Sequence, residues 1–449
     1  MGFLGLASLA LAAVLAAAAA SAADLVVLTG GKVAKFQDRD GTARDAGVVK
    51  FQGDPRLPRP TSAGGAFVTV QVASYPQSTN LVAYGPVIEL PPDVWRRKGE
   101  NWVYADKDGA RGGLRKMVLG AKKLLIKWQG DGFTPPPGPA GYVEVWIELE
   151  GTRYLGRFHD FKKNDATALI TRKPSEPAAA GERAFWDVLH HDDDSEAHQQ
   201  EALAQLAKAV KKRKKDGRSH FLIGMLRLYR YGRMTPDIRN VSEAARAEAV
   251  AALAAFREAL PLLWDGMTGD TRVPGFVGAA AYQAGVALGD EALEAEGLAI
   301  LGESFALNPL FNVFDYIPVA MVETRDDPAF QIVIDALDEV LGGPGITCVV
   351  EQAEVCADAG LAPSNTAGSL ILFGDLYAKA GRLGDATTWY NLGRALAAAR
   401  PTPYRFQDVA DERVATVAER IALYDDADPS NDPLLFGAGE QNCAGCHNR

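Results

Sequence analysis

The sequence has few residues of the types that usually carry catalytic chemistry. Only four cysteines and six histidines occur among its 449 residues. It contains no Ser/His/Asp set, no glycine-rich phosphate loop and no cysteine in a setting suited to nucleophilic catalysis. After residue 23, no apolar run is long enough to span a membrane. We therefore expect a chain that is not an enzyme unless a bound group supplies the chemistry.

Positive charge is also scarce. The 47 Lys and Arg residues are outnumbered by 57 Asp and Glu residues, giving a net charge of -10. A nucleic-acid or anionic-membrane surface is therefore not expected. One basic run is the exception; it suits the solvated C-terminal end of a helix, with a polyanion site as the alternative. Its members are Lys208, Lys211, Lys212, Arg213, Lys214, Lys215 and Arg218.

Two of the four cysteines lie close together at the end of the chain. Cys443, Cys446 and His447 form the pattern C-x-x-C-H, which is the spacing used to attach a c-type haem. In one tight turn the two sulfurs reach the porphyrin edge, while the adjacent imidazole ligates the iron. A zinc half-site, the alternative, would need a fourth ligand and usually a second Cys/His pair. We expect one covalent haem c on Cys443 and Cys446, with His447 as axial ligand.

The N-terminal residues indicate export. Residues 1–23 form a continuous apolar run that ends in small residues, as in a signal peptide cleaved near Ala22 or Ala23; an uncleaved anchor is the alternative. We expect a periplasmic or extracellular protein, which agrees with haem attachment outside the cytoplasmic membrane. In an oxidising compartment, Cys348 and Cys356 are expected to form a disulfide. That bridge requires a bend, because a straight helix would separate the two residues by roughly 12 Å.

Residues 24–172 show the period-two pattern of strands broken by Gly, Pro and Asp turns. We expect an antiparallel β-sandwich or barrel that serves as a binding or spacer module. Two Asp-x-Asp-Gly sequences, at 38–41 and 106–109, are interpreted as hairpin turns rather than calcium loops. The expected strands are centred on 25–28, 48–51, 67–72, 81–84, 117–119, 124–128, 142–149 and 154–158.

Residues 173–181 have the composition of a linker, and residues 182–425 show the 3.6-residue period of an all-α helical-repeat domain. Residues 426–449 then form the C-terminal haem-attachment segment. Small and aromatic residues at tetratricopeptide-like positions predict one helix pair; they are Gly374, Tyr377, Gly381, Ala386 and Tyr390. The expected helices are 182–191, 196–215, 219–231, 242–263, 275–288, 291–306, 328–341, 367–380, 384–399 and 407–424.

Residues 182–449 resemble a group of secreted bacterial proteins in which tetratricopeptide-like helices precede a C-terminal C-x-x-C-H motif. The resemblance is carried by the stretches 221–225, 308–314, 374–390 and 428–433 together with the haem motif. It implies an exported monohaem cytochrome, and it supplies neither a partner nor a reaction.

Two acidic clusters have a metal-binding alternative. His191, Asp194 and His198 would share one helical face, but Ser195 is expected to cap a helix there, which favours a solvated turn. The second cluster is interpreted as a surface turn rather than a calcium loop. Its carboxylates are those of Asp425, Asp426, Asp428 and Asp432.

The residue opposite His447 must come from upstream, because only Asn448 and Arg449 follow the motif. Candidates on apolar helical faces are Met225, Met267 and Met321, followed by His220. We expect an exposed haem without a firm methionine ligand, covered on one edge by residues 434–436. Electron transfer with a protein redox partner docked by the helical repeats is the favoured function. The alternatives are a haem-bearing sensor or scaffold, and a binding protein in which the haem is structural.

Overall fold

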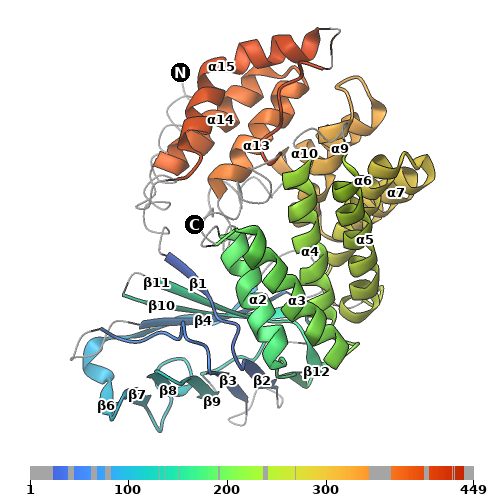
Figure 1. The fold of residues 1–449 in the computed structure, drawn as a ribbon. Coiled ribbons are helices and arrows are strands. Elements are labelled where there is room, and N and C mark those ends of the chain that lie inside the picture. The colour runs from blue at the N-terminus through green and yellow to red at the C-terminus, as the bar shows by residue number, and fades with distance from the viewer. Residues whose placement is uncertain are drawn as a thin grey trace, which may run out of the picture.

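A computed structural model describes residues 24–38, 45–61, 68–75, 82–130, 132–136, 138–150, 152–190, 193–235, 241–267, 269–342, 366–398, 404–426, 428 and 430–438. Within them, an N-terminal region of β-sheets precedes an all-α region of paired helices. Figure 1 shows the sheets at one end of the molecule, helices α2 and α3 above them, and α13 to α15 at the opposite end. The predicted fold class is confirmed.

The β region is built from two sheets. The first has five strands in the order β1-β11-β10-β4-β5, and the second has eight in the order β12-β13-β2-β3-β9-β8-β7-β6. The strands are β1 (Asp24–Val27), β2 (Val33–Gln37), β3 (Ala46–Gln52), β4 (Val68–Tyr75), β5 (Val82–Leu90), β6 (Arg96–Lys98), β7 (Asn101–Ala105), β8 (Leu114–Gly120), β9 (Lys123–Gln129), β10 (Tyr142–Leu149), β11 (Thr152–Phe158), β12 (Phe161–Asp165) and β13 (Ala168–Thr171), with a 3-10 turn η1 at Pro92–Val94.

One core lies between the two sheets. Buried residues of both sheets, such as Val49 and Phe51 of β3 and Val143 and Val145 of β10, belong to one cluster. A Cβ atom added at Gly156 would lie 2.1 Å from the Phe51 ring, so glycine lets β11 approach β3. Adjacent strands are antiparallel except for β1, which pairs with β11 in parallel. The arrangement is a sandwich of two open sheets.

Strand β10 is covered on both of its faces. Nearly every residue of this strand is buried, including the charged Glu144. A strand between two covered faces loses the apolar–polar alternation of a half-exposed strand. The sequence-predicted strands are present where described, whereas β2, β6, β7, β12 and β13 were not predicted, because they are short or polar.

The helices are α2 (Glu176–Leu189), α3 (Glu196–Lys212), α4 (Gly217–Met234), α5 (Glu243–Leu263), α6 (Val273–Leu288), α7 (Glu291–Leu307), α8 (Pro309–Asn312), η2 (Val313–Tyr316), α9 (Ile317–Val322), α10 (Pro328–Gly342), α13 (Thr366–Lys379), α14 (Leu383–Ala398) and α15 (Gln407–Asp425). Side-chain caps fix several starts: Ser175, Ser195, Asp216, Ser242 and Asp290 each accept a hydrogen bond from a first-turn backbone N–H. All ten predicted helices are present, whereas the short elements between 309 and 322 were not predicted.

Residues 173–181 were predicted to form a linker, and this prediction is wrong for residues 176–181. Residues 176–181 form the first turns of α2, capped by Ser175. Pro177 stands in the first turn, where its missing N–H costs nothing. Ala178 and Ala179 are buried, and a Cβ atom at Gly181 would lie 2.7 Å from Leu206. Composition suggested a linker because small residues that pack helices closely also occur in flexible segments.

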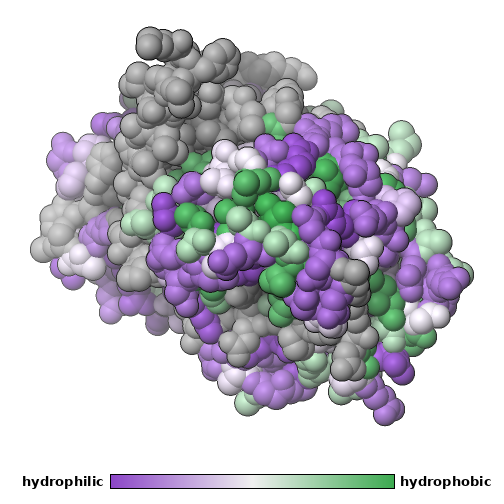
Figure 2. Space-filling view, turned by 90° about the horizontal axis from the view of Figure 1, so that it is seen from above, coloured by the Kyte–Doolittle hydropathy of each residue, from purple (hydrophilic) through white to green (hydrophobic). Residues whose placement is uncertain are grey.

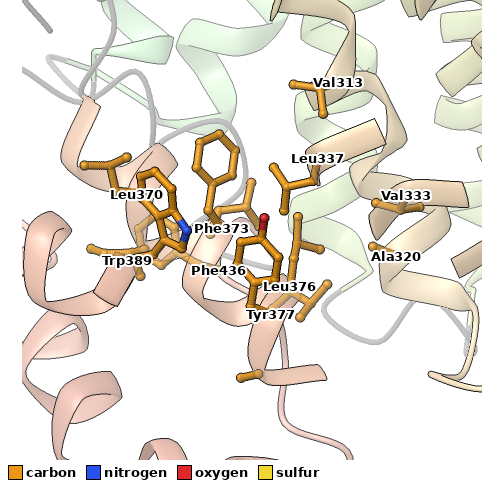
Figure 3. Packing of buried hydrophobic residues seen from close by; sticks show 14 of the residues in the cluster. Val313, Ala320, Val333, Leu337, Leu370, Phe373, Leu376, Tyr377, Trp389 and Phe436 are labelled. Carbon is orange, nitrogen blue, oxygen red and sulfur yellow. The ribbon is translucent and has the colours of Figure 1, made fainter. Parts of the chain in front are cut away.

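Paired helices meet through small residues. In the predicted tetratricopeptide-like pair, a Cβ atom at Gly374 of α13 would lie 2.3 Å from the Tyr390 ring of α14, and Gly381 ends the first helix with a φ of 74°. Gly224 of α4 meets Phe256 of α5 in the same way. Two clusters fill the array, one around α2 to α6 and one from α6 to the C-terminal segment (Figure 3). Among the described helices, none is both long and apolar enough to cross a bilayer.

Candidate functional site

The predicted haem ligands Cys443, Cys446 and His447 lie outside the described residues, as do Cys348, Cys356 and His191. The structure does describe residues 430–438, which lead directly to the haem motif. The geometry of this segment shows how the chain is held up to Ala438.

The segment is bound by a buried carboxylate. Asp375 of α13 is fully buried, and its Oδ1 accepts hydrogen bonds from Arg413 Nε (3.0 Å), Arg420 Nη2 (3.1 Å) and the Tyr390 hydroxyl. Its Oδ2 accepts from the backbone N–H of Phe436 at 2.5 Å. One carboxylate thus joins α13, α14, α15 and the C-terminal segment. We call these residues, Asp375, Tyr390, Arg413, Arg420 and Phe436, the anchor.

Further bonds fix the same segment. Arg413 Nη2 and Arg420 Nη2 donate to the carbonyl of Leu434 at 3.2 and 3.0 Å. The Tyr424 hydroxyl donates to the carbonyl of Pro433 at 2.6 Å. Phe436 is fully buried and lies in the cluster that also contains Phe373 and Trp389 (Figure 3). The backbone before the haem motif is therefore part of the folded core.

The charges of the anchor are strongly coupled. Burial opposes ionisation of Arg420, but the Asp375 carboxylate, together with the Tyr424 and Tyr390 side chains, outweighs it and raises the pKa of this guanidinium. Burial, reinforced by the charge of Asp375, likewise raises the pKa of the Tyr390 hydroxyl. Two arginines share one carboxylate, and the Leu434 carbonyl takes up part of their remaining donor capacity. The anchor thus needs both a charged Asp375 and a bound segment to satisfy its buried donors.

The candidates for the distal haem ligand differ in burial and in their distance from the C-terminal segment. Met321, in α9, is partly buried, and its Cε lies 3.7 Å from a Cβ atom built at Gly437. Met225 is partly buried in the cluster around α2 to α6. Met267 is 79% exposed in the loop after α5, so its expected place on an apolar helical face is wrong. His220 is partly exposed, with Nε2 3.1 Å from the Lys214 carbonyl.

The three residues expected to cover one edge of the haem differ in their exposure to solvent. Leu435 and Phe436 are buried in the core, whereas Leu434 is 50% exposed. Of these three, only Leu434 therefore offers a sizeable apolar surface to a group outside the core. Gly437 follows with a φ of 102°, a conformation that favours glycine and turns the chain as it leaves the anchor.

The acidic clusters form turns. Asp426 Oδ1 accepts from the Asp428 backbone N–H at 2.8 Å, and Asp428 Oδ1 accepts from the Ser430 N–H at 3.0 Å. Ser195 caps α3 as predicted, and Asp194 pairs with Arg233 at 3.0 Å.

The Asp-x-Asp-Gly sequence at 106–109 is a turn between β7 and β8, in which Asp106 accepts a hydrogen bond from the Asp108 N–H at 2.9 Å. The sequence at 38–41 lies mostly outside the described residues. Within the described chain, no group of three or more His, Cys, Asp or Glu residues is placed to hold a metal.

Lys208, Lys211 and Lys212 lie in the last turns of α3 as expected, whereas Arg218 lies in the first turn of α4. Two members of the run are not free in solvent. Lys208, Lys211, Lys212, Lys214 and Lys215 are exposed. Arg213 pairs with Asp160 at 2.5 Å and with Asp216 at 3.0 Å. Arg218 pairs with Glu182 at 3.2 Å. Both arginines therefore belong to the boundary between the sheets and the helices.

That boundary contains a buried ionic network that the sequence analysis missed. On neighbouring strands Glu144 and Arg157 stand directly opposite one another and form an ion pair, and Trp146 Nε1 donates to Glu144 at 3.1 Å. Asp270 binds Arg272 through two bonds of 2.7 and 2.6 Å, and the Arg272 guanidinium lies 4.3 Å from the centre of the Tyr142 ring. The start of α6 is thereby joined to β10.

A second part of the network reaches α2 and α4. Lys32, in the loop after β1, binds Glu182 of α2 at 2.8 Å. Burial lowers the pKa of Lys32, although Glu182 opposes the shift. Burial disfavours ionised Glu182, but Lys32 and Arg218 outweigh it and hold its pKa below the ordinary value. Glu144, one of two glutamates in the otherwise apolar strand β10, was the one signal in the sequence that could have indicated this network.

No known family and no curated protein matches the sequence. Of the expected resemblance, the structure shows only a fold. A β-sheet region is followed by an array of paired helices, and one pair has the small-to-aromatic contact of a tetratricopeptide repeat.

Proposed function

We propose that the protein is an exported monohaem c-type cytochrome that exchanges electrons with a protein redox partner. The observation that carries the proposal is the C-x-x-C-H motif of Cys443, Cys446 and His447, which follows a segment held in the core by the anchor. Haem c, when bound, supplies a one-electron ferric–ferrous couple. The cysteines would hold the porphyrin edge, and His447 would ligate the iron.

The anchor supports a defined place for the haem. Four residues lie between Ala438 and Cys443, so five Cα–Cα steps keep the first haem cysteine within about 18 Å of Ala438. A haem on Cys443 and Cys446 would therefore stay near Ala438, which follows Phe436 at α13 and Gly437 near Met321 of α9. A tether of this length favours electron transfer, because it keeps the group near one surface where a partner can dock.

The surface at this end supports docking of a protein. Figure 2, which looks onto the end at the top of Figure 1, shows apolar residues in several places among polar ones. Leu423 of α15 is 38% exposed and Leu434 is 50% exposed. Small apolar areas with a polar rim are typical of transient interfaces. We propose that the helical array provides the docking surface.

The first test is the intact mass of the full-length gene product, made in cells with a c-type haem maturation system. We expect a mass equal to the cleaved polypeptide plus one haem, lost in the Cys443→Ala, Cys446→Ala double variant. A wild-type mass equal to that of the apo-protein would contradict the proposal.

The second test distinguishes an electron carrier from the alternatives. Electron paramagnetic resonance of the ferric protein reports low-spin iron when two strong axial ligands are present, and high-spin iron when the distal position is open. Rapid reduction and reoxidation by a protein partner support the carrier. Slow exchange together with high-spin iron that binds small ligands favours the sensor, and a haem-less double variant with full activity in the host favours a structural haem.

A further inference from the structure

The outer face of the eight-stranded sheet is strongly basic. Its inner face packs into the sandwich core, and Figure 1 shows the sheet along the bottom of the molecule with the helices above it. The eight strands contain eleven Lys and Arg residues and one carboxylate, that of Asp165, in a chain whose net charge is -10. The cations are Arg96, Arg97 and Lys98 of β6, Arg115 and Lys116 of β8, Lys123 and Lys127 of β9, Lys50 of β3, Lys35 of β2, and Lys162 and Lys163 of β12.

The hairpin turns of this sheet do not cancel the positive charge of its strands. Their described residues carry five carboxylates and three cations, so a large positive excess remains. The carboxylates are those of Asp38, Asp45, Glu100, Asp106 and Asp108, and the cations are Lys107, Arg111 and Lys122. The acidic balance of the whole chain therefore conceals a region of opposite sign.

The register of the strands places four of the lysines in one row. Residues directly paired in antiparallel strands project from the same face of a sheet. Lysines of this row stand on β12, β2 and β9, which are alternate strands, so they recur about every 9–10 Å. All four lysines are exposed, and the two aliphatic residues between them are half-buried. In order, the row consists of Lys163, Ile170, Lys35, Val48, Lys127 and Lys116.

Most cations of this row lack a partner. Lys116 and Lys127 stand directly opposite one another, where like charges repel. Within the described part of the chain, no ion pair or side-chain hydrogen bond engages Lys35, Lys116 or Lys127. Lys163 pairs with Asp165 at 3.4 Å, and both of these side chains are about half exposed. A line of unpaired, solvent-facing cations is complementary to a linear polyanion.

The spacing and composition of the row indicate which class of polyanion fits. Duplex DNA carries a charge about every 1.7 Å along its axis, which is far denser than the lysines of the row. Single-stranded nucleic acids and membrane interfaces favour exposed aromatic side chains, whereas the aromatic residues of these strands, such as Trp102 and Trp128, pack inward. A polysaccharide with a carboxylate on every second sugar has sparse charge, and the apolar faces of its rings suit Ile170 and Val48.

We propose that the outer face of the eight-stranded sheet binds a linear acidic polysaccharide that carries a carboxylate on every second sugar. The polymer crosses the strands along the row, and Lys163, Lys35 and Lys127 each meet a carboxylate. Lys116 shares the carboxylate at Lys127, so binding relieves the repulsion between these two lysines. The face lies at the opposite end of the molecule from α13 to α15, and the binding does not depend on the haem.

The test uses the full-length purified protein and short oligosaccharides of hyaluronate, which has a carboxylate on every second sugar. Calorimetric titration at neutral pH should show saturable binding that weakens as salt is raised. The double variant Lys35→Gln, Lys127→Gln should bind about tenfold or more weakly. The double variant Lys211→Gln, Lys212→Gln, which removes two exposed lysines from the end of α3, is the matched control and should bind normally. Urea unfolding checks that both variants are folded.

Three results would overturn the proposal. The first is the absence of hyaluronate binding to the wild type at low salt. The second is an equal loss of affinity in the two double variants, which would place the polymer on the basic run of α3 or show a general charge effect. The third is binding of duplex DNA or of phosphatidylglycerol vesicles as tight as that of hyaluronate at the same salt concentration, because the face would then not select a polysaccharide.

Discussion

Replacing Asp375 with asparagine tests whether the anchor holds the C-terminal segment in the core. The carboxylate is fully buried and accepts bonds from Tyr390, Arg413, Arg420 and the Phe436 backbone. An amide of the same shape keeps one acceptor oxygen but removes the charge, and its NH2 group faces donors. Arg420 then remains in the core without its carboxylate partner, and Arg413 keeps only the half-exposed carboxylate of Glu412.

The free energy of unfolding that Asp375→Asn should lose follows from the burial of Asp375 and its two arginine partners. The side chains of Arg413 and Arg420 are 9% and 7% exposed, and that of Asp375 is 0% exposed. Removing one partner from a buried pair of this kind destabilises a protein by about 3–5 kcal/mol. Asp338→Asn is the matched control, because Asp338 also accepts from a tyrosine, Tyr377, and pairs with an arginine, Arg382. Its pair is 43% and 38% exposed, so a loss of about 1 kcal/mol or less is expected.

Urea unfolding of the two variants measures the difference, and hydrogen exchange of the Phe436 amide shows whether the segment has detached. We expect Asp375→Asn to lose at least about 2 kcal/mol more than Asp338→Asn and to expose the Phe436 amide. If the two variants lose the same free energy while that amide stays protected, the anchor does not hold the segment.

Three further predictions concern other positions. Gly374→Ala should destabilise the protein by about 1–3 kcal/mol in urea unfolding, because the new methyl group would meet the Tyr390 ring, whereas Gly384→Ala, with nothing within 4 Å, should not. Burial and nearby cations hold the pKa of His159 below its unfolded value, so stability should fall as pH drops below about 6.5, less steeply in His159→Gln. The ferric haem protein should lack the far-red thioether-to-iron band; if the band appears, Met321→Leu should abolish it and Met225→Leu should not.

Local patterns were sufficient to predict the helices and most of the longer strands. The 3.6-residue period gave all ten long helices, and Ser195 and Ser242 were recognised as caps because an N-cap is a local hydrogen bond. Strands such as β12, with the sequence FKKND, were missed because their few residues are mostly polar and exposed. Gly374 and Tyr390 indicated their contact because both belong to a short repeat pattern.

The ionic groups could not be predicted in the same way. Asp375 meets Arg413, Arg420 and Phe436 across 38 to 61 positions of sequence, and Lys32 meets Glu182 across 150. No periodicity connects such residues, so only the fold brings them together. In sequence they look like ordinary surface charges, and Arg218 was interpreted as a solvated cation for that reason.

The parallel pairing of β1 with β11 also bears on how the protein is made. Asp24 to Val27 pair with Thr152 to Leu155, so the first strand has no partner until about 130 further residues have been synthesised. Pairing over such a separation forms slowly, because a long loop must close first. A chain delivered through an export channel from its N-terminus would therefore present an unpaired, apolar β1 before its partner emerged. On such a route the first sheet could be completed only after β11 had also crossed.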